Sequence, residues 1–189
     1  MMTEAKQAKH LMLAQLEAGL DAIRQSPKDS GAVRLIVRRP RDGEREVLQE
    51  AELDLVDGLI GDSWKARGSK RTPDGSAHPE MQITIMNARV IAVLAPEPQY
   101  WPLAGDQLFV DLDLSSENVP PGTRIAFGSA VLEVTPPPHT GCKKFQARFG
   151  DEALKFISTP EGRSRQMRGI HARVIQPGTV RVGDLAKKL

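Results

Sequence analysis

The feature that most constrains the fold of this chain is a series of short apolar runs, separated by turns, from residue 31 to the end. A strand with one buried face alternates apolar and polar residues, and tight turns favour Gly, Asp, Asn and Pro. The strand-like runs cover residues 33–37, 83–85, 108–112, 125–127, 131–134, 174–175 and 180–182. Two pairs of runs flank a short turn sequence, Gly128-Ser129 or Pro177-Gly178, so each pair predicts a hairpin.

The order of these runs also predicts the fold class. Strands and helices do not alternate regularly, which excludes a doubly wound sheet. The sequence therefore predicts a mainly β fold that is barrel-like and mostly antiparallel, with a few helices. Interior helices are expected at 87–94, with Asn87 as the N-cap, and at 150–157, where the first turn is acidic. Gly-Asp dipeptides at residues 61, 105, 150 and 183 are interpreted as turns.

The N-terminal segment has a different period. Apolar residues recur every three or four positions over residues 3–25, which predicts one amphipathic helix that ends at Ser26-Pro27. We interpret residues 1–30 as a helical appendage and residues 31–189 as the β-barrel domain. The appendage either packs on the domain or forms an oligomer contact, with packing favoured, and the sequence does not predict the oligomeric state.

Composition and the absence of common motifs exclude several classes of function. The single cysteine in 189 residues excludes an intrachain disulfide and indicates a reducing compartment. No signal-peptide core or membrane-spanning run is evident, so we expect a cytoplasmic protein without a membrane partner. A net charge of +2 and few aromatic residues argue against a nucleic-acid partner. The sequence motifs of phosphate loops, dinucleotide-binding folds, zincins and serine hydrolases are absent.

Cys142 is the strongest functional candidate. It lies in the segment P-P-P-H-T-G-C-K-K-F, residues 136–145, where prolines stiffen the approach and cations surround the thiol. Nearby Lys and His cations favour the reactive thiolate form of a cysteine. The alternative is an inert buried thiol, which is how a free cysteine usually behaves. His139 is a base, a ligand orienter or a plain loop residue by the same reasoning.

Basic residues gather in three stretches, and any one of them alone is interpreted as a solvated face. The three together, in a chain with a net charge near zero, suggest a local anion site. The stretches are Lys65, Arg67, Lys70 and Arg71; Lys143, Lys144 and Arg148; and Arg163, Arg165, Arg168, His171 and Arg173. In the last stretch, strand alternation would direct His171 and Arg173 toward one face.

From about residue 53 to residue 185 the chain resembles the MOSC domain, named for the C-terminal part of molybdenum cofactor sulfurases. Three segments carry the resemblance: D-G-L-I-G-D-S-W (57–64), S-S-E-N-V-P-P-G-T-R-I-A-F-G-S-A-V-L-E-V-T (115–135) leading into H-T-G-C-K-K-F, and R-G-I-H-A-R-V-I-Q-P-G-T-V-R-V-G-D (168–184). Many members read Gly-Glu-Asn where this chain has Gly105-Asp106-Gln107, and several have proline where it has Gly141. The chain is similar to a stand-alone member.

The resemblance implies a β-rich barrel and a molybdenum cofactor (molybdopterin) with Cys142 as the metal ligand. Basic side chains are suited to the phosphate and pterin of this cofactor. The implied cofactor-binding residues are Lys65, Arg67, Thr140, Gly141, Lys143, Lys144, Arg168, His171 and Arg173.

The same resemblance implies a reductase of small N-hydroxylated or related N–O or S–O substrates. Cys142 and His139 are the catalytic candidates, and either His139 or Lys144 would donate a proton. Electrons would come from a partner protein, because no flavin or iron–sulfur motif is visible. The alternative is a non-catalytic carrier of the cofactor, or of sulfur on Cys142.

Overall fold

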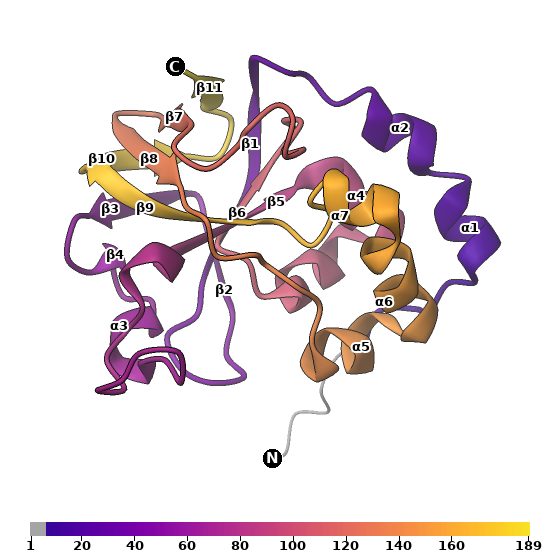
Figure 1. The fold of residues 1–189 in the computed structure, drawn as a ribbon, viewed down its shortest axis with the longest axis horizontal. Helices are drawn as coiled ribbons and strands as arrows, with labels where there is room; N and C mark the ends of the chain where they lie inside the picture. Colours follow the sequence, from indigo (N-terminus) through magenta and orange to yellow (C-terminus); the bar gives the residue numbers. More distant parts are fainter. Residues whose placement is uncertain (1–6) are drawn as a thin grey trace.

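A closed β-barrel forms the centre of the structure, a computed structural model that describes residues 7–189 (Figure 1). Its strands are β1 (Ser30–Arg38), β5 (Ile83–Asn87), β6 (Leu108–Val110), β7 (Arg124–Phe127), β8 (Ala130–Val134), β9 (Ile170–Gln176) and β11 (Leu185–Lys188). They are hydrogen-bonded in the order β11-β7-β8-β9-β5-β6-β1, and β11 also pairs with β1, which closes the ring. Neighbouring strands are antiparallel except for the parallel pair β5 and β6. The predicted barrel-like, mostly antiparallel fold is confirmed.

Four further strands extend or flank the barrel. β2 (Glu46–Leu48) extends the sheet beyond β1, and β3 (Glu50–Asp54), β4 (Gly58–Leu59) and β10 (Gly178–Arg181) form a separate sheet. The predicted hairpin at Gly128-Ser129 is confirmed, because β7 and β8 pair directly across it. The hairpin predicted at Pro177-Gly178 is wrong. Both edges of β9 are already occupied by β5 and β8, so β10 turns away and pairs with β3.

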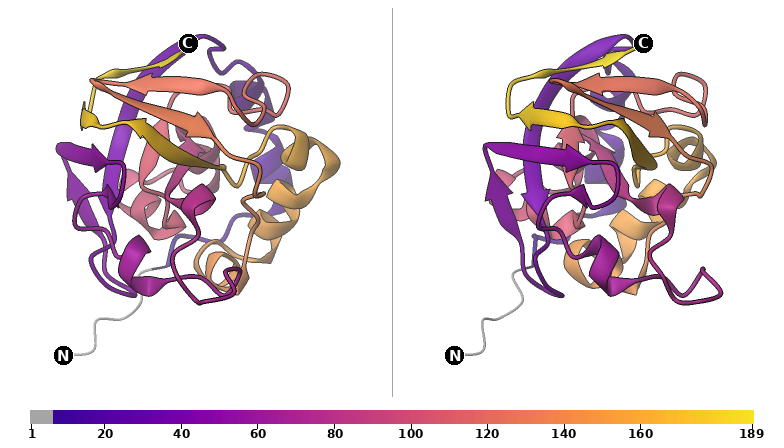
Figure 2. Two further views of the ribbon diagram at one scale, coloured as in Figure 1. Left: turned by 60° about the vertical axis from the view of Figure 1, so that its left-hand side comes forward. Right: turned by 90° about the vertical axis from the view of Figure 1, so that its left-hand side faces the viewer.

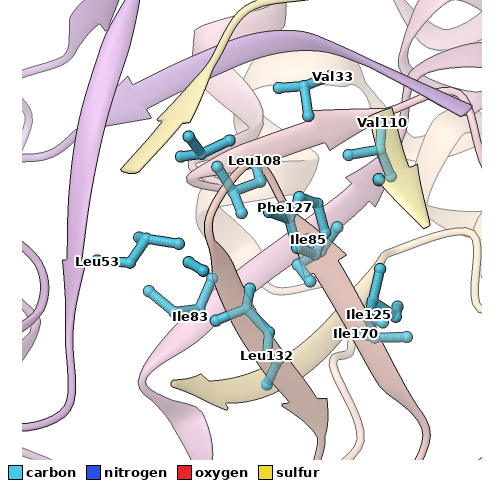
Figure 3. Packing of buried hydrophobic residues seen from close by; sticks show 14 of the residues in the cluster. Val33, Leu53, Ile83, Ile85, Leu108, Val110, Ile125, Phe127, Leu132 and Ile170 are labelled. Atoms are coloured by element: carbon cyan, nitrogen blue, oxygen red, sulfur yellow. The ribbon is translucent and has the colours of Figure 1, made fainter. Parts of the chain in front are cut away.

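Apolar side chains fill the barrel and a second layer outside it. Alternate residues of the strands point inward, among them Val33, Ile85 and Phe127, and meet in the interior (Figure 3). The second cluster contains Phe109 and lies between the outer face of the barrel and the helices. Because Phe109 belongs to β6 and points opposite to its barrel-facing neighbours, one strand contributes to both cores.

Helices cover one side of the barrel and one end (Figure 1). They are α1 (Leu13–Glu17), α2 (Leu20–Arg24), α3 (Trp64–Arg67), α4 (Ala88–Leu94), α5 (Lys143–Phe149), α6 (Asp151–Ser158) and α7 (Pro160–Ser164), with 3-10 segments at Pro79–Met81 and Pro98–Ala104. The predicted helix at 87–94 is confirmed as α4, and the Asn87 side chain accepts a hydrogen bond from the Arg89 amide. The helix predicted at 150–157 is confirmed as α6. Within residues 7–189, no helix combines the length and apolarity needed to cross a bilayer.

The N-terminal segment is less regular than predicted. Instead of one helix over 3–25, the described part contains α1 and α2, which are separated at Ala18-Gly19; the first residues of the predicted helix lie outside the described range. Glycine has a low helix propensity, and Gly19 lies so close to Val93 of α4 that a Cβ would clash. Leu16 and Ile23 are buried in the second apolar cluster, between the barrel and the helices, so this segment packs against the rest of the chain.

Candidate functional site

The proline-rich loop places Cys142 at the end of the barrel where β8 leaves it. Cys142 has an extended backbone, immediately precedes α5 and is exposed. The loop that follows α3 and the helices that follow β8 lie at this same end (Figure 2). Gly141 lies against Leu154 of α6 with no room for a Cβ, so glycine lets the loop pass close to that helix.

Two cavities share Cys142 in their walls. The first, which we call the histidine cavity, has a volume of about 430 Å³ and includes His78, His139 and His171 in its lining. The second, the arginine cavity, has a volume of about 280 Å³ and is lined by seven basic side chains of the described residues. Its basic residues are Arg39, Arg41, Arg45, Arg67, Lys144, Arg148 and Arg168. Cys142, His139, Arg39 and Arg67 belong to both linings, so the two cavities meet beside the thiol.

Arg39 is held by a buried carboxylate. Its Nε and Nη2 donate to the two carboxylate oxygens of Asp62 at 2.9 and 2.8 Å, and its Nη1 donates to the carbonyl of Gly105 at 2.9 Å. The Asp62 side chain is fully buried and that of Arg39 is 9% exposed. Such a paired, two-point contact fixes the guanidinium rigidly in the wall between the cavities.

A second buried pair lies beneath His139. Arg168 donates to Asp106 Oδ2 at 2.6 Å and to the carbonyl of Ala104 at 2.9 Å, and it stacks over the Phe145 ring at 5.1 Å. The other carboxylate oxygen, Oδ1, is buried without a hydrogen bond and lies 3.4 Å from Nδ1 of His139. Complete burial raises the pKa of Asp106, and the charge of Arg168 opposes that rise.

His139 and His171 are neutral at pH 7. Burial lowers the pKa of His139 well below its usual range, and the charge of Arg168 and the neighbouring His171 lower it further. Burial lowers the pKa of His171 to about 4, against the opposing effect of its hydrogen bond to Pro137. Nδ1 of His171 lies 2.9 Å from the Pro137 carbonyl, so Nδ1 carries the proton and Nε2 is left as an acceptor. The rings lie 4.6 Å apart between centroids.

Guanidinium groups converge on Gly105 in the arginine cavity. Arg39 donates to the Gly105 carbonyl, and a Cβ at Gly105 would lie 3.3 Å from Nη2 of Arg45 and 3.9 Å from Nη1 of Arg148. Arg45 and Arg148 form no ion pair with a residue in the described range. Burial, Arg148 and Arg39 together lower the pKa of Arg45 to about 10, and its buried Nε has no hydrogen-bond partner. Like charges brought together in this way favour a bound anion.

The structure brings together most of the predicted site residues. Arg67, His139, Thr140, Cys142 and His171 line the histidine cavity, and Lys144 and Arg168 line the arginine cavity. Gly141 lies in a third cavity behind the loop, together with Arg168.

Three predicted residues do not line either main cavity. Lys65 pairs with Asp57 at 2.6 Å, and Lys143 is exposed on the first turn of α5. Arg173 lies on the same face of β9 as His171 but further along the strand, where it pairs with Glu133 at 2.7 Å.

Sequence reasoning missed Arg39, Asp62, Arg45 and Asp106. A usable signal was available for Arg39, which follows the apolar run at 33–37 in a cluster of arginines that ends a strand. No local signal identified the two aspartates, because each carboxylate binds an arginine that is distant in the sequence.

The fold and this site define a class of protein, a β-barrel that presents one exposed thiol where two cavities with basic linings meet. Residues 74–186 match the MOSC domain, so the chain belongs to the MOSC domain family. No curated protein matches the sequence.

Several solved structures are similar to this one, among them the following two. The YuaD protein from Bacillus subtilis is 20% identical, with a TM-score of 0.58 over 83% of this chain and 94% of that chain. YiiM from Escherichia coli is 17% identical, with a TM-score of 0.53 over 84% of this chain and 69% of that chain. These likenesses support the fold alone. The MOSC domain family is associated with molybdenum cofactor binding.

Proposed function

We propose that this protein binds the molybdenum cofactor, with Cys142 as a ligand of the metal. The observation that carries the proposal is the position of the exposed thiol, which lies where the histidine and arginine cavities meet. A soft thiolate suits a metal that favours sulfur ligands. No group of three or more His, Cys, Asp or Glu side chains within residues 7–189 could hold a bare metal ion, so the site fits a cofactor that brings its own metal ligands.

The arginine cavity supplies what the organic part of such a cofactor requires. Arg45 and Arg148 converge on Gly105 without a carboxylate partner, and the buried Nε of Arg45 is a hydrogen-bond donor without an acceptor. A phosphate group in this cavity would accept from these donors and relieve their mutual repulsion. We therefore assign the anionic group of the cofactor to the arginine cavity and its metal to the side of Cys142.

The proposed reaction is the two-electron reduction of small N-hydroxylated or related N–O or S–O compounds. The cofactor, when bound, supplies a redox-active metal that exchanges electron pairs with the substrate. Cleavage of an N–OH bond consumes two electrons and two protons and yields an N–H group and water. The electrons come from a partner electron-donor protein. The proposal assumes a reducing compartment such as the cytoplasm, where an exposed thiol stays reduced.

The residues of this chain position the substrate and handle its protons. His171 Nε2 is an acceptor for the hydroxyl or N–H of a substrate in the histidine cavity. His139 is neutral in the present structure, so it donates a proton only when a further negative charge beside it raises its pKa. Lys144 is less suited to this role, because its exposed ammonium pairs with Asp42 at 2.9 Å.

Metal retention tests the assignment of Cys142. The wild type, Cys142→Ala and the matched control Arg173→Ala are purified from cells that make the cofactor, and molybdenum is measured per protein. We expect the wild type and the control to retain similar amounts, and Cys142→Ala to lose most of its molybdenum. Equal molybdenum in the wild type and Cys142→Ala would reject the ligand role.

A carrier of the cofactor, or of a sulfur atom on Cys142, is the second candidate function. The exposure of Cys142 favours it, because a carried group must be accessible to a recipient protein. A carrier holds molybdenum or a persulfide but does not reduce benzamidoxime with dithionite-reduced methyl viologen as the electron source. Steady turnover in this assay would exclude the carrier.

A further inference from the structure

The histidine cavity contains a second group of basic side chains that is separate from the convergence at Gly105. Arg67, Lys70 and Arg71 line this cavity and are exposed, and none of them forms an ion pair with a residue in the range 7–189. No Asp or Glu side chain contributes to its lining. By contrast, the neighbouring Arg39 is neutralised by Asp62. The mouth of this cavity therefore carries uncompensated positive charge.

The segment that carries these cations is held in a closed loop. The Ser69 amide donates to the Gly75 carbonyl at 3.2 Å, and the Thr72 hydroxyl donates to the Ser69 carbonyl at 2.9 Å. The Arg71 amide donates to the Ser69 hydroxyl at 3.1 Å. Because the loop bonds to itself, the backbone that carries Lys70 and Arg71 is already ordered, and only the side-chain entropy of these residues is lost when an anion binds.

The rest of the cavity lining offers different chemistry. Trp64 and Met81 provide apolar surface, and His171, the cross-strand neighbour of Thr84, provides a neutral acceptor. A ligand that fits this lining has a flat or apolar body, a hydroxyl or N–H that donates to His171, and an anionic group that reaches the loop. The volume of about 430 Å³ is typical of small-molecule sites.

The number of basic groups exceeds what the cofactor requires. Arg45 and Arg148 already converge on one point in the arginine cavity, which accounts for one phosphate. Resting on the proposed function, we infer that the histidine cavity binds a small substrate whose reducible group faces Cys142 and whose anionic group contacts Lys70 and Arg71. The structure thereby assigns the protein to anionic substrates.

The test compares two probes that differ by one carboxylate group, benzamidoxime and 4-carboxybenzamidoxime. Their binding to the protein purified from cofactor-producing cells is measured by isothermal titration calorimetry at low and high salt. We expect the carboxylated probe to bind about tenfold more tightly at low salt, because a charge-assisted contact adds to the shared ones. Salt should reduce this preference, since the cations are exposed.

A double variant, Lys70→Gln with Arg71→Gln, should remove the preference for the carboxylated probe and leave binding of the neutral probe unchanged. The control, Lys28→Gln with Lys187→Gln, removes the same charge at exposed positions away from the cavity and should retain the preference. Equal affinity of the two probes for the wild type would overturn the inference. A preference that survives the Lys70/Arg71 double variant would also overturn it.

Molybdenum measured on the same samples separates this inference from the proposed function. The Lys70/Arg71 double variant should retain the molybdenum of the wild type, and a large loss would show that these residues serve the cofactor instead of the substrate. A wild-type protein that binds the carboxylated probe with the expected preference but never holds molybdenum would overturn the proposed function and leave the anion preference standing.

Discussion

At the scale of single residues, the fold controls the ionisation of the site by burying it. His171 lies on β9 with only 3% of its surface exposed, and the Pro137 carbonyl fixes its proton on Nδ1. A cationic imidazolium at this buried position would lose its hydration by water and would face the positive charge of Arg168. The folded state therefore favours the neutral ring. The neutral ring is what makes Nε2 available as an acceptor.

This preference predicts a pH dependence of stability. The folded pKa of about 4 lies below the unfolded value near 6.5, so between these pH values the unfolded chain binds a proton that the folded one does not. The stabilisation is complete above pH 6.5 and is lost as the pH falls toward 4, by at most about 3 kcal/mol.

Urea unfolding at a series of pH values between 4 and 8 measures this effect. In His171→Asn the amide nitrogen can still donate to the Pro137 carbonyl but nothing titrates, so its free energy of unfolding should fall less steeply than that of the wild type. His139 remains in both proteins, and its pKa is lowered less in the variant because His171 no longer acts on it, which makes the expected difference between the two curves larger. Parallel curves for the two proteins would contradict the assignment.

The residues also show what a sequence cannot reveal. Gly61-Asp62 and Gly105-Asp106 were interpreted as turns, because an aspartate after glycine is typical of an exposed turn. Both carboxylates are instead fully buried, one bound to Arg39 and the other to Arg168. These partners are 23 and 62 positions away in the sequence, so only the closed barrel brings them together.

At the scale of elements, the sequence predicts the features that depend on local signals but not the pairing of strands that are distant in the sequence. Asn87 caps α4 and the acidic start of α6 is as expected, because both signals act within one turn of helix. The turn at Gly128-Ser129 is equally local. The pairing of β10 with β3 joins residues 178–181 to residues 50–53, and no neighbouring residue encodes it.

The junction that leads into β9 gives a prediction at this scale. Gly169 has φ +108°, and a Cβ there would lie 2.5 Å from the Ile85 carbonyl of β5 and 3.1 Å from Nδ1 of His139. Gly169→Ala should therefore cost roughly 3 kcal/mol or more, since both the backbone and a neighbouring strand must move.

The exposed Gly43 provides the matched control, because it has φ +82° but no atom within 4 Å of its Cβ position. Gly43→Ala should lower the free energy of unfolding by only about 1 kcal/mol, which is the cost of placing a Cβ on a backbone with positive φ. Chemical denaturation of both variants measures the difference. If the two substitutions cost the same, the contact of Gly169 with β5 and His139 has no energetic weight.

At the scale of the whole molecule, basic charge is concentrated at one end of the barrel although the chain has a net charge of only +2. Arg45 is the clearest case, because burial and then the charges of Arg148 and Arg39 lower its pKa to about 10. A lowered pKa means that the fold disfavours the charged arginine relative to the unfolded chain. The clustered arginines of this cavity therefore lower the stability of the folded protein until an anion binds among them.

This reasoning predicts opposite effects of one substitution on stability and on cofactor binding. Arg45→Gln should stabilise the cofactor-free protein by about 1 kcal/mol, a value reduced for the solvent screening of a partly exposed group. The same variant should lose molybdenum when it is made in cofactor-producing cells, because the anion then has fewer donors.

Arg173→Gln, which breaks only an exposed pair with Glu133, should lower stability by less than about 1 kcal/mol and leave the molybdenum content unchanged. Thermal unfolding of the metal-free proteins and elemental analysis of the loaded ones measure both effects, and an Arg45→Gln protein that is destabilised yet fully loaded would refute the anion-site interpretation of this cavity.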